Sequence, residues 1–441
     1  GSVCETIKDT IDYLNSNGGK YGLVVVHLFR PFSIVDLKNV IPESVKKIAV
    51  LDRSKDASGS GEALYLDVVN ALKDMKVKIY GGRYGLSSKN TTPADIKAVY
   101  DFLESDKTFS NFTIGIIDDV TNLSLDISKD FKIPNCELEM LIYGYGSDGM
   151  VSTSKDLLKI IGANTDKCVQ GYFQYDSKKS GGVTRSHIRI DNDIIRKTYY
   201  VDNPNVLVIS KDSYIYKYDI LDNVCDGGIV LLNTNLNSND LIKSLPDRVK
   251  YLLASKHLRF YTIDANGIVN KIGLRNKIST CMEICIFHLI QIIDDDDVTK
   301  IMKESNEKRF ADKGEDIVRV NNEIVDVSLE YLKEIEVDLA WCDLVVASTR
   351  ENDFCGAINN LHGDDLPVSA FLDKSSGIYT AGSTKWEKRG IAERIPCWIK
   401  ENCIQCNQCS FVCPHAVIRP FLVDKDADVS SIPSLMPRDV N

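Results

Sequence analysis

The stretch that decides the fold is Glu137-Leu138-Glu139-Met140-Leu141-Ile142-Tyr143-Gly144-Tyr145-Gly146-Ser147-Asp148-Gly149. Its mostly apolar first half favours a buried strand, and its second half is a glycine-rich turn. Apolar residues at helical spacing follow over Ser152–Ile161. A strand, a tight turn and a helix in this order predict the opening of an α/β unit.

The same alternation continues towards the C-terminus, so the unit is expected to extend over residues 136–335. Further strands are predicted at Cys168–Phe173, Thr184–Ile190, Val206–Ile209, Gly228–Leu232 and Leu258–Ile263. Two helical patterns, at Lys277–Ile293 and Lys313–Ile335, complete it.

Residues 1–125 indicate another α/β unit, with a parallel sheet. Strands are predicted at Leu23–Leu28, Lys47–Leu51, Lys76–Tyr80 and Thr113–Ile117. Helices are predicted at Cys4–Leu14, Gly61–Lys73 and Pro93–Leu103.

A cysteine motif lies near the other end of the chain: Cys403-x-x-Cys406-x-x-Cys409-x-x-x-Cys413-Pro414. Bacterial-type ferredoxins use this spacing to hold [4Fe–4S] clusters, and in two-cluster forms the fourth cysteine binds the other cluster. A zinc site would more often split into two separated C-x-x-C pairs. We therefore predict iron–sulfur ligation by these four cysteines. We expect a second motif beyond Asn441, without which the ligand set is incomplete.

The predicted fold class is therefore α/β, with two successive α/β domains followed by two less regular parts. The predicted boundaries are 1–125, 136–335, an irregular linker at 336–394, and a truncated ferredoxin-like module at 395–441. The linker is rich in Gly, Asp, Ser and Thr, and we expect it to wrap a surface or a neighbouring subunit.

Composition excludes several classes of function. A net charge of −10 argues against nucleic acid as the main partner. No apolar run approaches the roughly 18 residues of a membrane span. Thirteen cysteines in a long chain without a signal peptide indicate a reducing compartment, and we predict a cytoplasmic protein.

The turn Gly144-x-Gly146-x-x-Gly149 formally matches a dinucleotide-binding fingerprint. An acidic residue should end the next strand, but Asp166 precedes that strand and Asp176 lies beyond it. An NAD-dependent dehydrogenase, another phosphate-bearing ligand and a purely structural turn all stay open.

Two other patterns have competing interpretations. Lys178-Lys179-Ser180-Gly181-Gly182 suits either a diphosphate or an exposed hairpin turn. Cys281, Cys285 and His288 share one helical face, but their apolar neighbours favour a core helix over a metal site.

Long segments resemble the pyruvate:ferredoxin oxidoreductase family, including the run Gly-Tyr-Phe-Gln-Tyr-Asp-Ser-Lys-Lys-Ser-Gly-Gly at 171–182. The other matching segments are His27–Phe32, Val50–Lys55, Gly81–Lys89, Ile117–Thr121, Ile160–Asp166, Leu366–Phe371, Trp386–Gly390 and Glu401–His415. The resemblance extends from near residue 20 to about residue 422.

This resemblance implies a thiamine-diphosphate enzyme that oxidises pyruvate with coenzyme A (CoA) to acetyl-CoA and CO₂. Electrons would pass to ferredoxin, flavodoxin or a fused NADP-reducing flavoprotein, and the enzyme would be a homodimer. The first unit resembles the transketolase C-terminal-like domain, and the second the gamma-type domain that contributes to CoA binding. Thiamine diphosphate and Mg²⁺ would be held by domains outside this chain, so no catalytic residue is assigned and the chain alone is not expected to turn over.

The family resemblance also makes certain residues candidate CoA contacts. They are Gly146, Lys155, Lys178, Lys179 and Ser180. Relatives usually carry Gly-Ala-Asn-Lys where this chain has Ser152-Thr153-Ser154-Lys155. Of these four positions, only Lys155 keeps the residue of the relatives. The alternative from another class is a non-catalytic electron-transfer or scaffold protein.

Overall fold

The structure is a computed structural model of the 441-residue chain. The residues it describes are 1–128, 130–176, 181–274, 277–346, 353–379, 381–383, 397–424 and 426–428. They belong to two compact units, Gly1–Arg389 and Gly390–Asn441, and each is described by itself.

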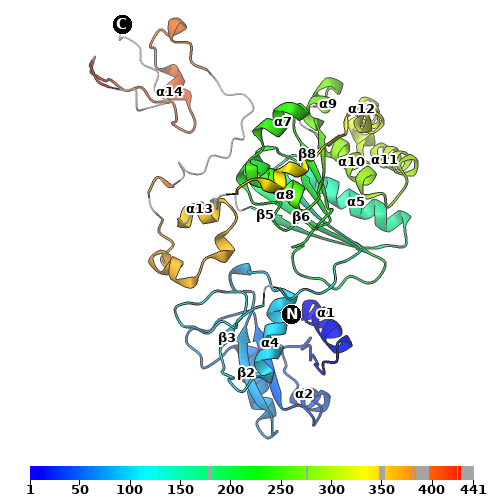
Figure 1. The fold of residues 1–441 in the computed structure, drawn as a ribbon. Helices are drawn as coiled ribbons and strands as arrows, with labels where there is room; N and C mark the ends of the chain where they lie inside the picture. The colour runs from blue at the N-terminus through cyan, green and yellow to red at the C-terminus, as the bar shows by residue number, and fades with distance from the viewer. Residues whose placement is uncertain are drawn as a thin grey trace. The chain divides into compact units, whose positions relative to one another are not determined.

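The first α/β domain contains a three-stranded parallel sheet, in the order β1-β2-β3 (Figure 1). Its strands are β1 (Lys47–Asp52), β2 (Lys78–Arg83) and β3 (Phe112–Thr113). Its helices are α1 (Cys4–Ser16), α2 (Ile34–Val40), α3 (Ala63–Leu72), the 3₁₀ turn η1 (Leu86–Ser88) and α4 (Pro93–Glu104). Thr92, the residue before α4, forms a reciprocal capping box with Asp95 and so fixes the start of the helix at Pro93.

The predicted strand Leu23–Leu28 is wrong. These residues form neither strand nor helix, and the side chains of Val24 and Leu28 are 45% and 65% exposed. The apolar run therefore lies largely on the surface of this unit, outside the three-stranded sheet. The predicted strands Lys47–Leu51 and Lys76–Tyr80 correspond to β1 and β2, and the three predicted helices are confirmed. The predicted strand Thr113–Ile117 is wrong beyond Thr113, the one residue that it shares with β3.

The second α/β domain contains a seven-stranded mixed sheet, in the order β10-β9-β8-β7-β4-β6-β5. Its strands are β4 (Leu138–Tyr145), β5 (Cys168–Tyr175), β6 (Val183–Asp191), β7 (Val206–Ile209), β8 (Ile229–Asn233), β9 (Arg259–Ile263) and β10 (Lys333–Ile335). Strands β4, β7, β8 and β9 are parallel, β6 runs antiparallel between β4 and β5, and β10 is antiparallel to β9. The fold class is α/β, as predicted.

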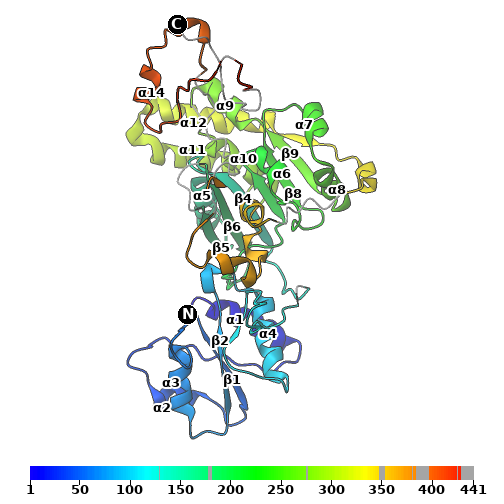
Figure 2. The same cartoon turned by 90° about the vertical axis from the view of Figure 1, so that its left-hand side faces the viewer.

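Helices cover both faces of this sheet. They are α5 (Met150–Asn164), α6 (Ser213–Lys217), α7 (Ser238–Ser244), α8 (Asp247–Ser255), α9 (Ala265–Ile272), α10 (Ser279–Ile290), α11 (Asp295–Phe310) and α12 (Glu315–Val327), with the 3₁₀ turns η2 (Ala311–Lys313) and η3 (Ser328–Tyr331). Figures 1 and 2 show α5, α10, α11 and α12 grouped together. Alternate residues of β4 enter two cores: Ile142 packs with α5 and α10, and Tyr143 with α6 and α8.

The predicted helix Lys313–Ile335 is wrong at its C-terminal end, because helical structure stops with the 3₁₀ turn η3 at Tyr331. Helix α12 ends at Val327, and β10 then pairs with β9 through Ile335, which is 4% exposed. Burial of Ile335 against a sheet edge overrides a local pattern that continued as helix.

In the part of the linker that the structure describes, the helices are short. These are η4 (Leu339–Asp343), α13 (Phe354–Asn359), η5 (Gly363–Asp365) and η6 (Val368–Lys374). The second unit contains η8 (Lys400–Asn402) and α14 (Gln408–Val412). Within the described ranges, no helix combines the length and apolar character needed to cross a bilayer.

Candidate functional site

The carboxyl ends of the parallel strands β4, β7, β8 and β9 form the edge where α/β sheets usually bind ligands. Polar side chains follow these strands. Asn233, at the end of β8, donates hydrogen bonds to the Ser210 carbonyl and to Asn266 Oδ1, both at 2.8 Å. Its own Oδ1 accepts from the Ala265 amide at 3.0 Å. The edge is thus a fixed polar network.

The glycine turn after β4 is filled by the half-buried carboxylate of Asp148. This group accepts from the Tyr145 amide at 2.7 Å, the Met150 amide at 2.9 Å and the Ser210 hydroxyl at 2.6 Å. Burial raises the pKa of Asp148 above its usual value, and the three hydrogen bonds oppose that rise. Since the Met150 amide at the start of α5 is paired with a carboxylate, the turn does not resemble a pyrophosphate cradle. This geometry argues against the NAD interpretation.

Two of the three glycines in this turn have structural roles. A Cβ at Gly144 would lie 2.4 Å from Thr184 Oγ1 on β6, and Gly149 has φ +94°, a conformation that side chains disfavour. Gly146 differs, because its nearest neighbours would lie 3.5 Å from a Cβ. Packing therefore does not require glycine at 146.

Gly146 lies beside the ends of the lysine-containing loop. Its amide donates to the Gly182 carbonyl at 3.0 Å, and β4 and β6 pair Tyr145 with Val183. Strand β5 ends at Tyr175, opposite Thr184. Lys178, Lys179 and Ser180 themselves lie outside the described residues, but both ends of their loop lie at the carboxyl edge next to Gly146.

Lys155 is on α5 and exposed to solvent. Its Nζ lies 5.3 Å from the centroid of the Phe173 ring on β5, a cation–π distance. The fold thus brings Gly146 to the lysine loop, and places Lys155 over β5.

The cysteine motif supplies ligand-type sulfurs on a short loop. Hydrogen bonds from backbone amides, that of Ile418 first, hold the pKa of Cys413 below its usual value, and the Gln405 amide lies 3.4 Å from Cys403 Sγ. Such amides favour thiolates, the form that iron–sulfur clusters require. Even so, the described residues hold no cluster of three or more His, Cys, Asp or Glu side chains arranged to bind a metal ion. Cysteine sulfurs are suitable ligands for an iron–sulfur centre, but the sulfurs of this motif are not arranged around a common point.

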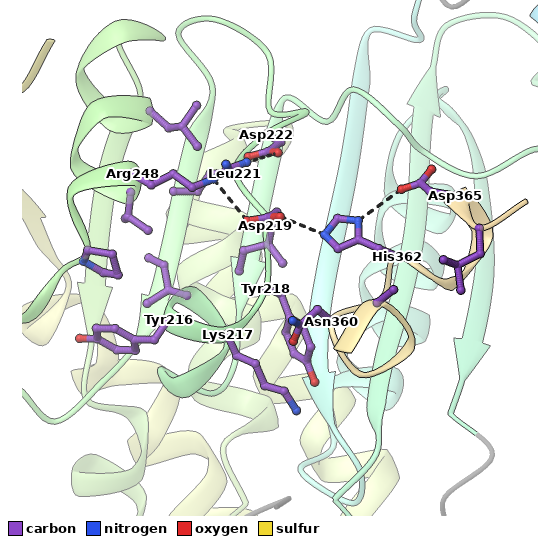
Figure 3. A pocket seen from close by; sticks show the side chains of 17 residues that line it. Tyr216, Lys217, Tyr218, Asp219, Leu221, Asp222, Arg248, Asn360, His362 and Asp365 are labelled. Carbon is purple, nitrogen blue, oxygen red and sulfur yellow. Dashed lines mark hydrogen bonds and ion pairs between the residues drawn. The ribbon is translucent and has the colours of Figure 1, made fainter. Parts of the chain in front are cut away.

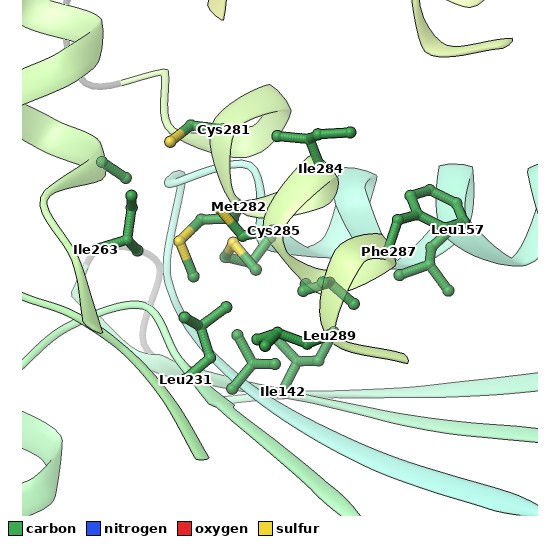
Figure 4. Packing of buried hydrophobic residues seen from close by; sticks show 14 of the residues in the cluster. Ile142, Leu157, Leu231, Ile263, Cys281, Met282, Ile284, Cys285, Phe287 and Leu289 are labelled. Atoms are coloured by element: carbon green, nitrogen blue, oxygen red, sulfur yellow. The ribbon is translucent and has the colours of Figure 1, made fainter. Parts of the chain in front are cut away.

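The core interpretation of Cys281 and Cys285 is confirmed. Both are fully buried, and Figure 4 shows them packed with Met282 above Ile142 and Leu231 of the sheet. The Cys281 side chain and burial together raise the pKa of Cys285 well above its usual value. His288 is turned to Asp295, with Nδ1 2.8 Å from Oδ2.

Family models match three parts of the chain. Residues 139–331 match "Pyruvate ferredoxin/flavodoxin oxidoreductase", residues 1–96 match "Pyruvate:ferredoxin oxidoreductase core domain II", and residues 352–392 match a domain of unknown function. The pyruvate:ferredoxin oxidoreductase of Moorella thermoacetica is 44% identical over 98% of this chain. The chain belongs to the pyruvate:ferredoxin/flavodoxin oxidoreductase family.

Other members of this oxidoreductase family are similar over nearly the whole chain. The pyruvate-flavodoxin oxidoreductase of Enterobacter agglomerans is 41% identical over 97% of it. The mitochondrial pyruvate dehydrogenase [NADP(+)] of Euglena gracilis is 37% identical over 98% of it. The chain spans 38%, 37% and 25% of the lengths of the Moorella, Enterobacter and Euglena proteins.

Sequence reasoning missed Asp148, Ser210 and Asn233 as parts of this edge. A usable signal was present, since Ser210 directly follows β7 and Asn233 ends β8. Polar residues at the ends of apolar parallel strands gather at one edge. The hydrogen bonds among them needed the strand order, which the sequence does not display.

Proposed function

We propose that this chain is the CoA-associated and electron-accepting part of an enzyme that oxidises pyruvate with CoA to acetyl-CoA and CO₂. The observation that carries the proposal is the position of Gly146, which packs without strain against Gly181 and Gly182 at one end of the loop that holds Lys178 and Lys179. The two lysines of this loop, together with a glycine beside its end, are residue types that suit the phosphates of CoA. Lys155 and Ser180 are the remaining candidate contacts.

In such an enzyme, thiamine diphosphate with Mg²⁺ supplies the carbanion chemistry and iron–sulfur clusters remove electrons singly. The contribution of this chain is to bind and orient CoA and to ligate iron through Cys403, Cys406, Cys409 and Cys413. No thiamine ligand of the family is assigned among its residues, so we expect no turnover from the 441 residues alone.

The partners proposed for the whole protein follow its relatives. The names of these relatives mention ferredoxin, flavodoxin or NADP⁺. We propose that the electron acceptor of the whole protein is one of these three. We propose a homodimer in the cytoplasm. The domain boundaries 1–125, 136–335, 336–394 and 395–441 stay predictions.

Calorimetric titration of the 441-residue chain with CoA tests the CoA site. The double variant Lys178→Ala/Lys179→Ala should weaken binding about tenfold or more, because each charge-assisted phosphate contact is worth about 1.5 kcal/mol or more. Lys159→Ala is the matched control, since this lysine is an exposed residue of α5 with 78% of its side chain accessible. Unchanged affinity in the double variant would contradict the site.

Parallel titrations separate the alternatives. NADH that binds more tightly than CoA, and competes with it, would favour an NAD-dependent dehydrogenase. Failure of both ligands to bind would favour a non-catalytic electron-transfer or scaffold protein, for which the amide-supported cysteine loop is the supporting observation.

A further inference from the structure

A segment of the linker, Asp353–Tyr379, contacts both α/β domains within the Gly1–Arg389 unit; we call it the strap. It contains α13, η5 and η6, and lies inside the region matched by the family model of unknown function. The CoA site and the cysteine motif use none of its residues. Its contacts therefore need their own explanation.

One end of the strap is fixed to the first domain by hydrogen bonds. The Asp119 carboxylate accepts from the Ser369 amide at 2.9 Å and from the Ser369 hydroxyl at 2.5 Å. The Val368 amide donates to the Ile117 carbonyl at 2.9 Å. These donors keep their hydrogens throughout the neutral pH range, so this attachment does not depend on pH there.

His362 holds the strap to the second domain. The first domain also binds the strap close to this contact, because Lys89 Nζ donates to the Asp364 carbonyl at 2.5 Å and lies 3.5 Å from Asp364 Oδ1. The Nε2 of His362 lies 2.9 Å from Asp219 Oδ2, on the loop after α6, and its Nδ1 lies 3.3 Å from Asp365 Oδ2, on the strap (Figure 3). Both ring nitrogens thus face carboxylate oxygens. A neutral imidazole has one N–H, whereas an imidazolium has two.

The charges around this contact are mainly acidic. Arg248, on α8, lies 3.2 Å from Asp219 and 2.5 Å from Asp222, so it partly neutralises two carboxylates. Asp365 brings a third carboxylate, and Lys217 lines the same cavity of about 490 Å³. Three carboxylates, one arginine and one lysine therefore line the cavity around His362.

Protonation of His362 therefore changes the strength of this contact. The imidazolium donates charge-assisted hydrogen bonds to both Asp219 and Asp365, and such bonds are roughly twice as strong as neutral ones. The neutral ring keeps one donor and turns a lone pair towards the second carboxylate. Histidine is the side chain that makes this change near neutral pH.

We propose that His362 is a proton-dependent latch that fastens the strap to the second α/β domain, while Asp119 and Ser369 keep its other end attached to the first domain. Lower pH closes the latch and higher pH loosens it. The strap forms one wall of the cavity in Figure 3, so the latch also controls how that cavity opens.

Hydrogen–deuterium exchange of the 441-residue chain tests the latch. The amides of Asn360, Leu361 and His362 donate hydrogen bonds to carbonyls of α13. Their exchange rates therefore report how often this part of the strap opens. After correction for intrinsic exchange rates, these amides should exchange about fivefold more slowly at about pH 6 than at about pH 8. His362→Gln keeps a donor but has no proton to bind, and should exchange at the faster rate at both pH values.

Two matched variants complete the design. His27→Gln removes an exposed histidine of the first domain and should keep the wild-type pH difference. Asp119→Ala should speed the exchange of Ser369 and its neighbours equally at both pH values. A wild-type strap whose exchange is independent of pH, or a pH difference that survives in His362→Gln, would overturn the proposal.

Discussion

Internal carboxylates occupy the starts of two helices in this family member. Asp52, at the end of β1, accepts from the Leu64 and Tyr65 amides of α3 at 3.2 and 3.1 Å, as Asp148 does at α5. Burial raises the pKa of both groups above the usual value. Helix starts that would otherwise attract phosphate are therefore already paired with the chain's own charges.

Glu283 is a buried acid that should make stability depend on pH. It lies on α10 at 4% exposure, where burial, aided by the charge of Asp156, raises its pKa to about 8 from a reference of 4.5. The folded state therefore retains a proton that the unfolded state releases between these values, and stability falls as pH rises through this window.

Glu283→Gln should remove that dependence. We expect it to stabilise the chain by about 1–2 kcal/mol at pH 8.5 and by much less at pH 5, because a neutral amide replaces a buried charge only at high pH. Urea denaturation at several pH values measures the difference. If the free energy of unfolding depended on pH in the same way in both proteins, the raised pKa of Glu283 would be contradicted.

At the scale of the elements, the close packing of β4 against its neighbours decides at which positions of the turn only glycine fits. A Cβ at Gly144 would overlap Thr184 on β6, whereas a Cβ at Gly146 would make ordinary contacts with Gly181 and Gly182. The two positions are two residues apart in sequence, but only Gly144 must be glycine for β4 and β6 to pair.

Gly144→Ala should destabilise the chain by about 2 kcal/mol or more, because its Cβ would overlap the Thr184 hydroxyl and force the strands apart. Gly146→Ala should change stability by less than about 0.5 kcal/mol, since its Cβ finds ordinary contacts. Thermal unfolding of the pair gives a matched comparison. Equal losses would show that packing, and not ligand approach, selects both glycines.

Element prediction succeeded where local pattern and tertiary burial agreed. Strand β7 occupies the predicted range Val206–Ile209, and α4 starts at the predicted Pro93. It failed at Leu23–Leu28, an apolar run left on the surface, and at β10, where a helical pattern meets a sheet edge. Strand pairing depends on distant residues, which a local pattern does not contain.

Contacts between the two α/β domains tie the Gly1–Arg389 unit together at the scale of the whole molecule. Lys197 Nζ lies 3.4 Å from Asp9 on α1 and donates to the Pro134 carbonyl at 2.8 Å, and Thr6 bonds Thr198 at 2.8 Å. The strap adds a second tie through Asp119 and Asp219. These specific polar contacts join the two α/β domains.

The cysteine module should bind iron poorly in this chain alone. Anaerobic reconstitution with iron and sulfide is expected to yield less than one [4Fe–4S] cluster per chain, because the fourth cysteine of such a motif serves another cluster. Iron and acid-labile sulfide assays measure the yield. Cys342→Ser, an exposed cysteine outside the motif, is the control. One full cluster per chain, lost in Cys413→Ser, would contradict this expectation.

The sequence alone determined the α/β class, the cysteine spacing and the family, because strand–turn–helix order and ligand spacing are local properties. Only the tertiary structure decided that Asp148 fills the glycine turn, that Gly146 bonds to Gly182, and that His362 lies between two carboxylates. Asp219 and His362 are 143 residues apart, and only the folded chain brings their charges within hydrogen-bonding distance.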